Sequence, residues 1–185
     1  MSGGATKGVK TSGGKTGGGE TGGGAGRRRV LFLCTGNSCR SQMAEGWARA
    51  LVGDAVEPFS AGLEARGLDP RAVRVMAEAG VDISGQRSRR LADLGAIELD
   101  DVVTVCDHAH ETCPLFPGGA RVAHVGFDDP PRLAAGATDE EEALAPYRRV
   151  RDEIRAFVAR LPGALDELAA GTSGGAAGGG GGEPG

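Results

Sequence analysis

The sequence contains no lysine after Lys15, although 15 arginines follow residue 29. It also lacks any apolar run approaching the roughly 18 residues of a transmembrane helix, and its N-terminus lacks the apolar segment of a secretory signal. The lack of a transmembrane run and of a signal segment predicts a cytoplasmic protein with no membrane partner. Because thiols stay reduced in that compartment, the four cysteines are expected to be catalytic, metal-binding or inert rather than structural disulfides.

Apolar residues are also scarce at both ends of the chain. Residues 1–28 hold only four of them, Met1, Ala5, Val9 and Ala25, and the last 15 residues read GTSGGAAGGGGGEPG. Such segments cannot bury enough apolar surface to offset the entropy of ordering them. We therefore expect a disordered basic tail at 1–28, one domain at 29–162, and at 163–185 a short helix near 165–170 followed by a Gly-rich tail.

Charge is distributed unevenly between these parts. The first 29 residues carry six basic residues and one glutamate, whereas residues 30–162 carry 15 arginines and 21 acidic residues. A basic tail on an acidic body could touch nucleic acid or an anionic membrane. The simpler interpretation, a solubilising tail with no nucleic-acid partner, is the one we adopt.

Short apolar segments alternate with amphipathic ones along the core, which predicts an α/β fold. We expect a single domain in which helices flank a four-stranded parallel sheet. The carboxyl ends of parallel strands form the usual ligand edge, and Cys34, Cys106 and the FDDP sequence at 127–130 all fall there. The expected strands are 29–34, 56–60, 100–106 and 121–126, and the expected helices are 38–51, 69–80, 88–94 and 138–161, with Asp69 and Thr138 as N-caps.

The sequence CTGNSCRS, from Cys34 to Ser41, has the composition of an anion-binding loop. Small residues allow successive backbone N–H groups to surround a tetrahedral anion, and the following helix directs its positive end at the same point. Arg40 can hold two oxygens with its planar fork, and this field favours the thiolate of Cys34, to which Ser41 could donate. The alternative is a buried cysteine followed by an ordinary helix. The expected binding residues are Thr35, Gly36, Asn37, Ser38, Cys39, Arg40 and Ser41, with the Cys39 side chain packed as a small apolar group.

The C-x5-R-S pattern after the first strand resembles the low-molecular-weight tyrosine phosphatase superfamily, and CTGNSCRSQMAEGW resembles its arsenate reductase branch. The similarity runs from about residue 29 to 161. It includes SAG at 60–62, VVTVCDHAHETCP at 102–114, GFDDP at 126–130 and YRRVRDEI at 147–154. The resemblance implies a phosphatase-like fold, reduction of arsenate to arsenite, and no metal or organic cofactor.

The resemblance also implies a general acid in the Asp-Pro pair that follows the fourth strand. Here that residue is Asp129, which would protonate the departing hydroxide. Asp128 is the alternative acid, and an ordinary acidic turn is the alternative to both.

A relay of three thiols is the further implication. Cys34 would form a covalent arsenic adduct, Cys106 would attack Cys34, and Cys113 would attack Cys106, after which thioredoxin would reduce the exposed disulfide. If 107–113 is helical, Cys106 and Cys113 lie roughly 10.5 Å apart along its axis. A disulfide does not span more than about 7 Å, so the segment is expected to unwind.

Other interpretations of these residues remain open. Cys106 and Cys113 could be inert, or zinc could bind among Cys106, His108, His110, Cys113 and His124. The whole chain could instead be a tyrosine phosphatase, an activity that a reductase of this kind could also show weakly, or a non-enzymatic redox switch that binds oxyanions.

One feature departs from the family pattern. Some members bind potassium beside the anion loop through an Asn, a Glu, the Ser of SAG and a later Thr-x-Asp. Asn37, Glu45 and Ser60 match, but the later positions are Arg87-Ser88-Arg89, and arginine cannot ligate a cation. Our hypothesis is that one of these guanidinium groups replaces the ion and pairs with Glu45. Alternatively, both point to solvent.

Overall fold

The computed structural model describes residues 26–112 and 119–173 and confirms the α/β architecture. Four parallel strands form one sheet in the order β2-β1-β3-β4. In the register, Cys34 pairs with Gly62 on β2, and Leu33 pairs with Thr104 on β3. The sheet therefore brings the ends of β1 and β3 side by side, as the sequence predicts. The strands are β1 Arg28–Cys34, β2 Val56–Gly62, β3 Asp101–Thr104 and β4 Arg121–His124.

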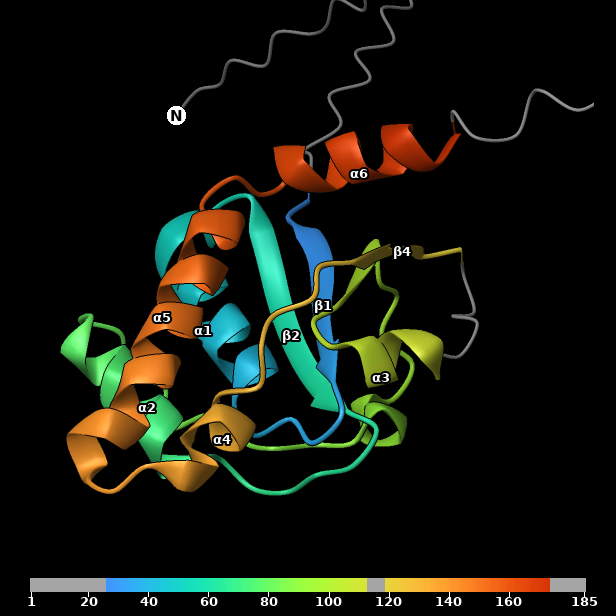
Figure 1. Cartoon of the computed structure of the whole chain (residues 1–185). Helices are drawn as coiled ribbons and strands as arrows, with labels where there is room; N and C mark the ends of the chain where they lie inside the picture. Colours follow the sequence, from blue (N-terminus) through green and yellow to red (C-terminus); the bar gives the residue numbers. More distant parts are fainter. Residues whose placement is uncertain (1–25, 113–118, 174–185) are drawn as a thin grey trace, which may run out of the picture.

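Helices α1, α2 and α5 gather on one side of the sheet, and α6 lies across the end at which the strands begin (Figure 1). No helix in the described part of the chain is both long and apolar enough to cross a bilayer. The helices are α1 Arg40–Val52, α2 Pro70–Glu78, α3 Asp107–Glu111, α4 Pro130–Leu133, α5 Glu140–Val158 and α6 Gly163–Ser173, with 3₁₀ turns η1 Leu91–Leu94 and η2 Ala134–Gly136.

The core forms around β1, whose residues Val30 to Leu33 are fully buried. This is the pattern of a parallel strand covered on both faces. On α1, Met43 and Trp47 are buried, but Leu51 is 40% exposed, so the predicted apolar stripe of this helix ends one turn early.

The helix predicted at 88–94 is wrong in its first half. Only Leu91–Leu94 is helical, as a 3₁₀ turn. The preceding residues run extended beside the anion loop, where Arg89 accepts a bond from the Gly62 N–H at 2.9 Å and donates to Asn37 Oδ1 at 2.8 Å. Hydrogen bonds to neighbouring segments therefore override the local preference.

Of the two predicted N-caps, one is confirmed and the other is displaced by one residue. Asp69 caps α2 by accepting from the N–H groups of Arg71 and Ala72, as predicted. For α5 the cap is Asp139 rather than Thr138: its carboxylate accepts from the Glu142 N–H at 2.8 Å. Thr138 lies one residue earlier and donates to the Glu142 side chain.

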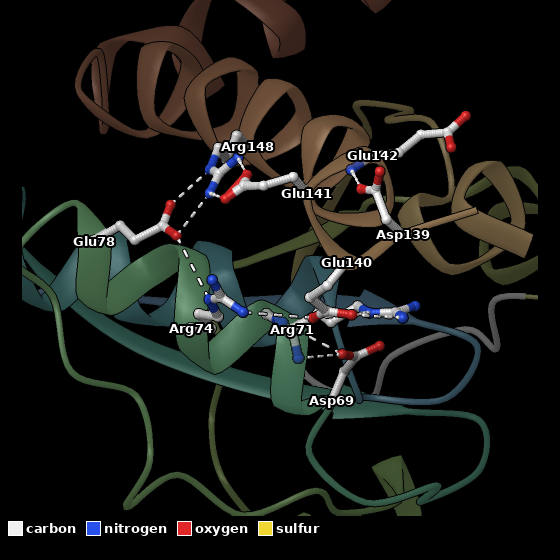
Figure 2. A network of polar contacts seen from close by, with 10 residues as sticks. Asp69, Arg71, Arg74, Glu78, Asp139, Glu140, Glu141, Glu142 and Arg148 are labelled. Atoms are coloured by element: carbon white, nitrogen blue, oxygen red, sulfur yellow. Dashed lines mark hydrogen bonds and ion pairs between the residues drawn. The ribbon is translucent and has the colours of Figure 1, made fainter. Parts of the chain in front are cut away.

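Ion pairs fasten α2 to α5 (Figure 2). Arg148 of α5 lies 2.7 Å from both Glu78 and Glu141. Arg71 of α2 lies 2.9 Å from Glu140. The two helices are thereby held in register, which matters for the site because α2 begins beside the anion loop.

Hydrogen bonds of the buried Tyr147 connect α5 to the anion loop. The Tyr147 hydroxyl donates to Asp69 at 2.8 Å, and the Asp69 N–H donates to the Ser38 carbonyl at 3.0 Å. Burial, together with the bond to Asp69, raises the pKa of Tyr147, so its hydroxyl stays protonated. One chain of hydrogen bonds therefore runs from α5 to the anion loop.

A second charged cluster lies where the strands begin. Arg28 donates to both oxygens of Asp101, which is only 2% exposed, and Arg121 lies 3.1 Å from the same carboxylate. Asp166 of α6 lies 2.9 Å from Arg28 and thereby attaches the last helix to the sheet. Burial outweighs the cationic neighbours and raises the pKa of Asp101.

We expect Asp101→Asn to lower the free energy of unfolding by about 3 kcal/mol, because Arg28 and Arg121 lose the buried carboxylate that they share and Arg28 keeps the exposed Asp166 as its partner. Urea denaturation monitored by Trp47 fluorescence measures the change. The control is Asp93→Asn, which removes an exposed partner of Arg90 and should change stability little. Equal losses in the two variants would contradict the prediction.

Candidate active site

Cys34 ends β1 and is 3% exposed within the loop that joins β1 to α1. Its sulfur lies 2.9 Å from the Ser41 hydroxyl, the contact expected from the sequence, and accepts from the Asn37 N–H at 3.1 Å. These two donors stabilise a negative charge on the sulfur. A buried sulfur with dedicated donors is suited to act as a nucleophile.

The Asn37 side chain orients the donors of the loop. Its backbone adopts the left-handed region at φ 45, and its Nδ2 donates at 2.9 Å to both the Ser41 and the Ser60 hydroxyl oxygens. Because the Ser41 oxygen accepts from Asn37, its own hydrogen is free to point at the Cys34 sulfur. Sequence reasoning placed Asn37 in the loop but did not reveal this role, which depends on β2 lying next to the loop.

Gly62 allows the loop to pack tightly against the end of β2. A Cβ atom there would lie 2.3 Å from the Glu64 carbonyl and 2.7 Å from the Asn37 nitrogen. The segment after Gly62 also binds the loop: the N–H groups of Leu63, Glu64 and Arg66 donate to the carbonyls of residues 34, 35 and 36. Three carbonyl oxygens that would repel an anion are thereby engaged elsewhere.

Arg40, in the first turn of α1, reaches across to the segment after β4. One guanidinium nitrogen lies 3.0 Å from the Asp129 carboxylate, and the other donates to the Phe127 carbonyl at 3.0 Å. Asp129 precedes α4, but its side chain forms no capping bond, so its carboxylate is available to Arg40. Asp128 instead faces Arg149 at 2.8 Å. Of the two carboxylates, Asp129 is the one beside the loop.

Cys106 follows β3 and brings a second thiol to the rim of the loop. It is 5% exposed, and its sulfur lies 3.4 Å from the Thr35 hydroxyl, next to Cys34 in the chain. Helix α3 begins at the following residue, so the first part of the predicted 107–113 helix is present. Cys113 lies outside the described residues.

Cys39 differs from these thiols. It is 3% exposed at the start of α1, and burial raises the pKa of its thiol well above the usual value. This agrees with its interpretation as a small packed side chain. Of the described residues, no group of three or more His, Cys, Asp or Glu is arranged to hold a metal ion.

The hypothesis that Arg87 or Arg89 replaces a potassium ion beside Glu45 is wrong about the partner. The buried carboxylate of Glu45 accepts from the Ser60 hydroxyl and pairs at 2.6 Å with Arg49, four residues later on the same helix. A guanidinium does neutralise Glu45, but it belongs neither to Arg87 nor to Arg89, which lie on a different segment. The i,i+4 spacing on α1 is the sequence signal that could have identified this pair.

We therefore expect activity to be the same in potassium and sodium chloride at equal ionic strength, because Arg49 already supplies the positive charge beside Glu45. Arg49→Gln should lower activity in sodium chloride, and potassium should restore part of the activity of this variant. Initial rates in the two salts measure the effect. Strong stimulation of the unmodified protein by potassium would contradict the prediction.

The fold and the loop together define a candidate oxyanion site, built around a cysteine at the carboxyl edge of a parallel sheet. The family model described as Low molecular weight phosphotyrosine protein phosphatase matches residues 29–171. The chain belongs to this family, as its C-x5-R-S loop predicts.

Two curated relatives from different bacteria carry the same name. The arsenate reductase of Bacillus subtilis strain 168 is 52% identical over 125 residues, which cover 68% of this chain and 88% of that protein. The arsenate reductase of Halalkalibacterium halodurans is 50% identical over 128 residues, covering 69% and 90%. Among solved structures, an arsenate reductase in the phosphate binding state aligns with a TM-score of 0.59 at 30% identity and covers 76% of this chain and 98% of that chain.

Proposed function

We propose that this protein reduces arsenate to arsenite through a covalent adduct on Cys34 and a relay of thiols. The observation that carries the proposal is the position of Cys106, whose sulfur lies 3.4 Å from the Thr35 hydroxyl at the rim of the anion loop. A phosphatase needs one thiol and water, whereas a reductase needs a second thiol as electron donor. The relatives named arsenate reductase support the same choice.

The first step joins sulfur to arsenic. The Cys34 thiolate, stabilised by Ser41 and the Asn37 N–H, attacks arsenate held by the loop amides and Arg40. The As–O bond to one hydroxyl breaks, and Asp129 donates the proton that lets this group leave as water. Asp129 lies 3.0 Å from Arg40, which places its carboxyl beside the oxygens that Arg40 would bind.

The second step transfers the electrons. The Cys106 thiolate attacks the Cys34 sulfur, an S–S bond forms, and the pair of electrons in the S–As bond stays with arsenic. Arsenic(V) thereby becomes arsenic(III), while two thiols become one disulfide. Cys113 then attacks Cys106 and releases Cys34 as a thiolate. Thioredoxin reduces the Cys106–Cys113 disulfide by thiol–disulfide exchange and restores the enzyme.

The test follows NADPH oxidation with thioredoxin, thioredoxin reductase and arsenate, together with the arsenite released per enzyme. We expect Cys113→Ser to release one arsenite and then stop, because the Cys34–Cys106 disulfide stays inaccessible. Cys106→Ser should release none. Unimpaired turnover in Cys113→Ser would contradict the relay.

Hydrolysis of p-nitrophenyl phosphate provides the control for these variants. The reaction needs Cys34, the loop and water, but neither Cys106 nor Cys113, because phosphate and arsenate share shape and charge. A slow hydrolysis retained by both variants would show that their anion loop is intact. Their loss of arsenate turnover would then result from a failure of electron transfer between the thiols.

A further inference from the structure

Helix α3, which begins directly after Cys106, is attached to β4 by a pair of histidines. The His110 and His124 rings stack with centroids 4.4 Å apart and planes inclined by 30°. His124 Nε2 also lies 3.2 Å from Asp107 Oδ1. We propose that His124 is a positioning residue that holds α3 helical and so controls when the relay passes from Cys106 to Cys113. This inference rests on the proposed relay.

The helix has little stability of its own. It is five residues long, and a single turn does not persist in water without tertiary contacts. Its backbone bonds include His110 N–H to Cys106 at 3.1 Å and Thr112 N–H to His108 at 3.2 Å. Ala109 is its one buried residue. Helix α3 also packs against β1 and β3, and the contacts of His110 and Asp107 with His124 add the connection to β4.

Both ring nitrogens of His124 have polar partners. The Thr104 hydroxyl lies 3.0 Å from Nδ1, and Asp107 Oδ1 lies 3.2 Å from Nε2. The side chain is thereby fixed between β3 and α3.

The first measurement is hydrogen exchange of the His110 and Thr112 amides in the reduced protein. We expect His124→Ala to speed their exchange about three- to five-fold, the size expected for losing one stacked ring pair. His108→Ala is the matched control, because its exposed ring has no such contacts and lies on the same helix. His110→Ala, with the same gain in helix propensity as His108→Ala, should speed exchange relative to that control.

The second measurement is rapid mixing with arsenate followed by thiol trapping and mass mapping. His124→Ala should leave the release of arsenite unchanged and speed formation of the Cys106–Cys113 disulfide by the same factor as the exchange. Unchanged amide exchange would overturn the proposal, and so would faster exchange without a faster disulfide step. If Cys113→Ser turned over normally, the relay itself would fail while the exchange result stood, so the two failures are distinguishable.

Discussion

Arg40→Lys is expected to lower kcat/KM for arsenate about 100- to 1000-fold. The Arg40 side chain is 14% exposed, and its guanidinium contacts the Asp129 carboxylate and the Phe127 carbonyl at the same time. A planar fork of this kind can bind two oxygens of a tetrahedral anion, whereas the ammonium of lysine is a single point charge. Steady-state kinetics with the thioredoxin system measure the effect.

A matched substitution separates this role from charge alone. Arg132→Lys alters an exposed arginine on α4, two residues beyond Pro130, and should leave kcat/KM unchanged. Binding of sulfate, an unreactive anion of the same shape, should weaken in Arg40→Lys and not in Arg132→Lys. Full activity of Arg40→Lys would show that Arg40 is not the anion-binding group.

Most of what positions the site could be predicted from the sequence because it depends on chain order. Cys34 and Cys106 each follow an apolar strand, and parallel pairing of those strands suffices to bring them to one edge. Small residues followed by Arg40 likewise predict an anion loop without knowledge of the fold. Signals of this kind are local, and local signals can be read from a sequence.

Features that join distant segments were missed. The stack of His110 on His124 needs α3 and β4 to lie side by side, and no periodicity indicates that. The Glu45–Arg49 pair has the i,i+4 spacing of a helical ion pair and is closer in sequence than Arg87 and Arg89, which lie 42 and 44 residues from Glu45. For α5, Thr138 and Asp139 are both good caps, and the backbone path alone decides between them.

The choice between two adjacent carboxylates was open in the sequence, and geometry now favours Asp129. It lies 3.0 Å from Arg40, while Asp128 is exposed and paired with Arg149. Nothing in DDPP distinguishes them, because the direction of each side chain depends on how α4 begins. Their substitution by asparagine is therefore a matched pair, identical in chemistry and one residue apart.

Asp129→Asn is expected to lower kcat for arsenate about 10²- to 10⁴-fold, the usual contribution of a general acid, whereas Asp128→Asn should retain activity. Single-turnover arsenite release by the two variants and by the unmodified protein measures the effect.

The same substitution should strengthen oxyanion binding while it weakens catalysis. In the free protein the Asp129 carboxylate occupies Arg40, so an arriving anion must compete with it. Asparagine carries no charge and competes less, which predicts tighter sulfate binding together with slower chemistry. A stability defect would weaken both properties and would not produce this opposition. Equal loss of rate in the two asparagine variants would contradict the assignment of Asp129 as the acid.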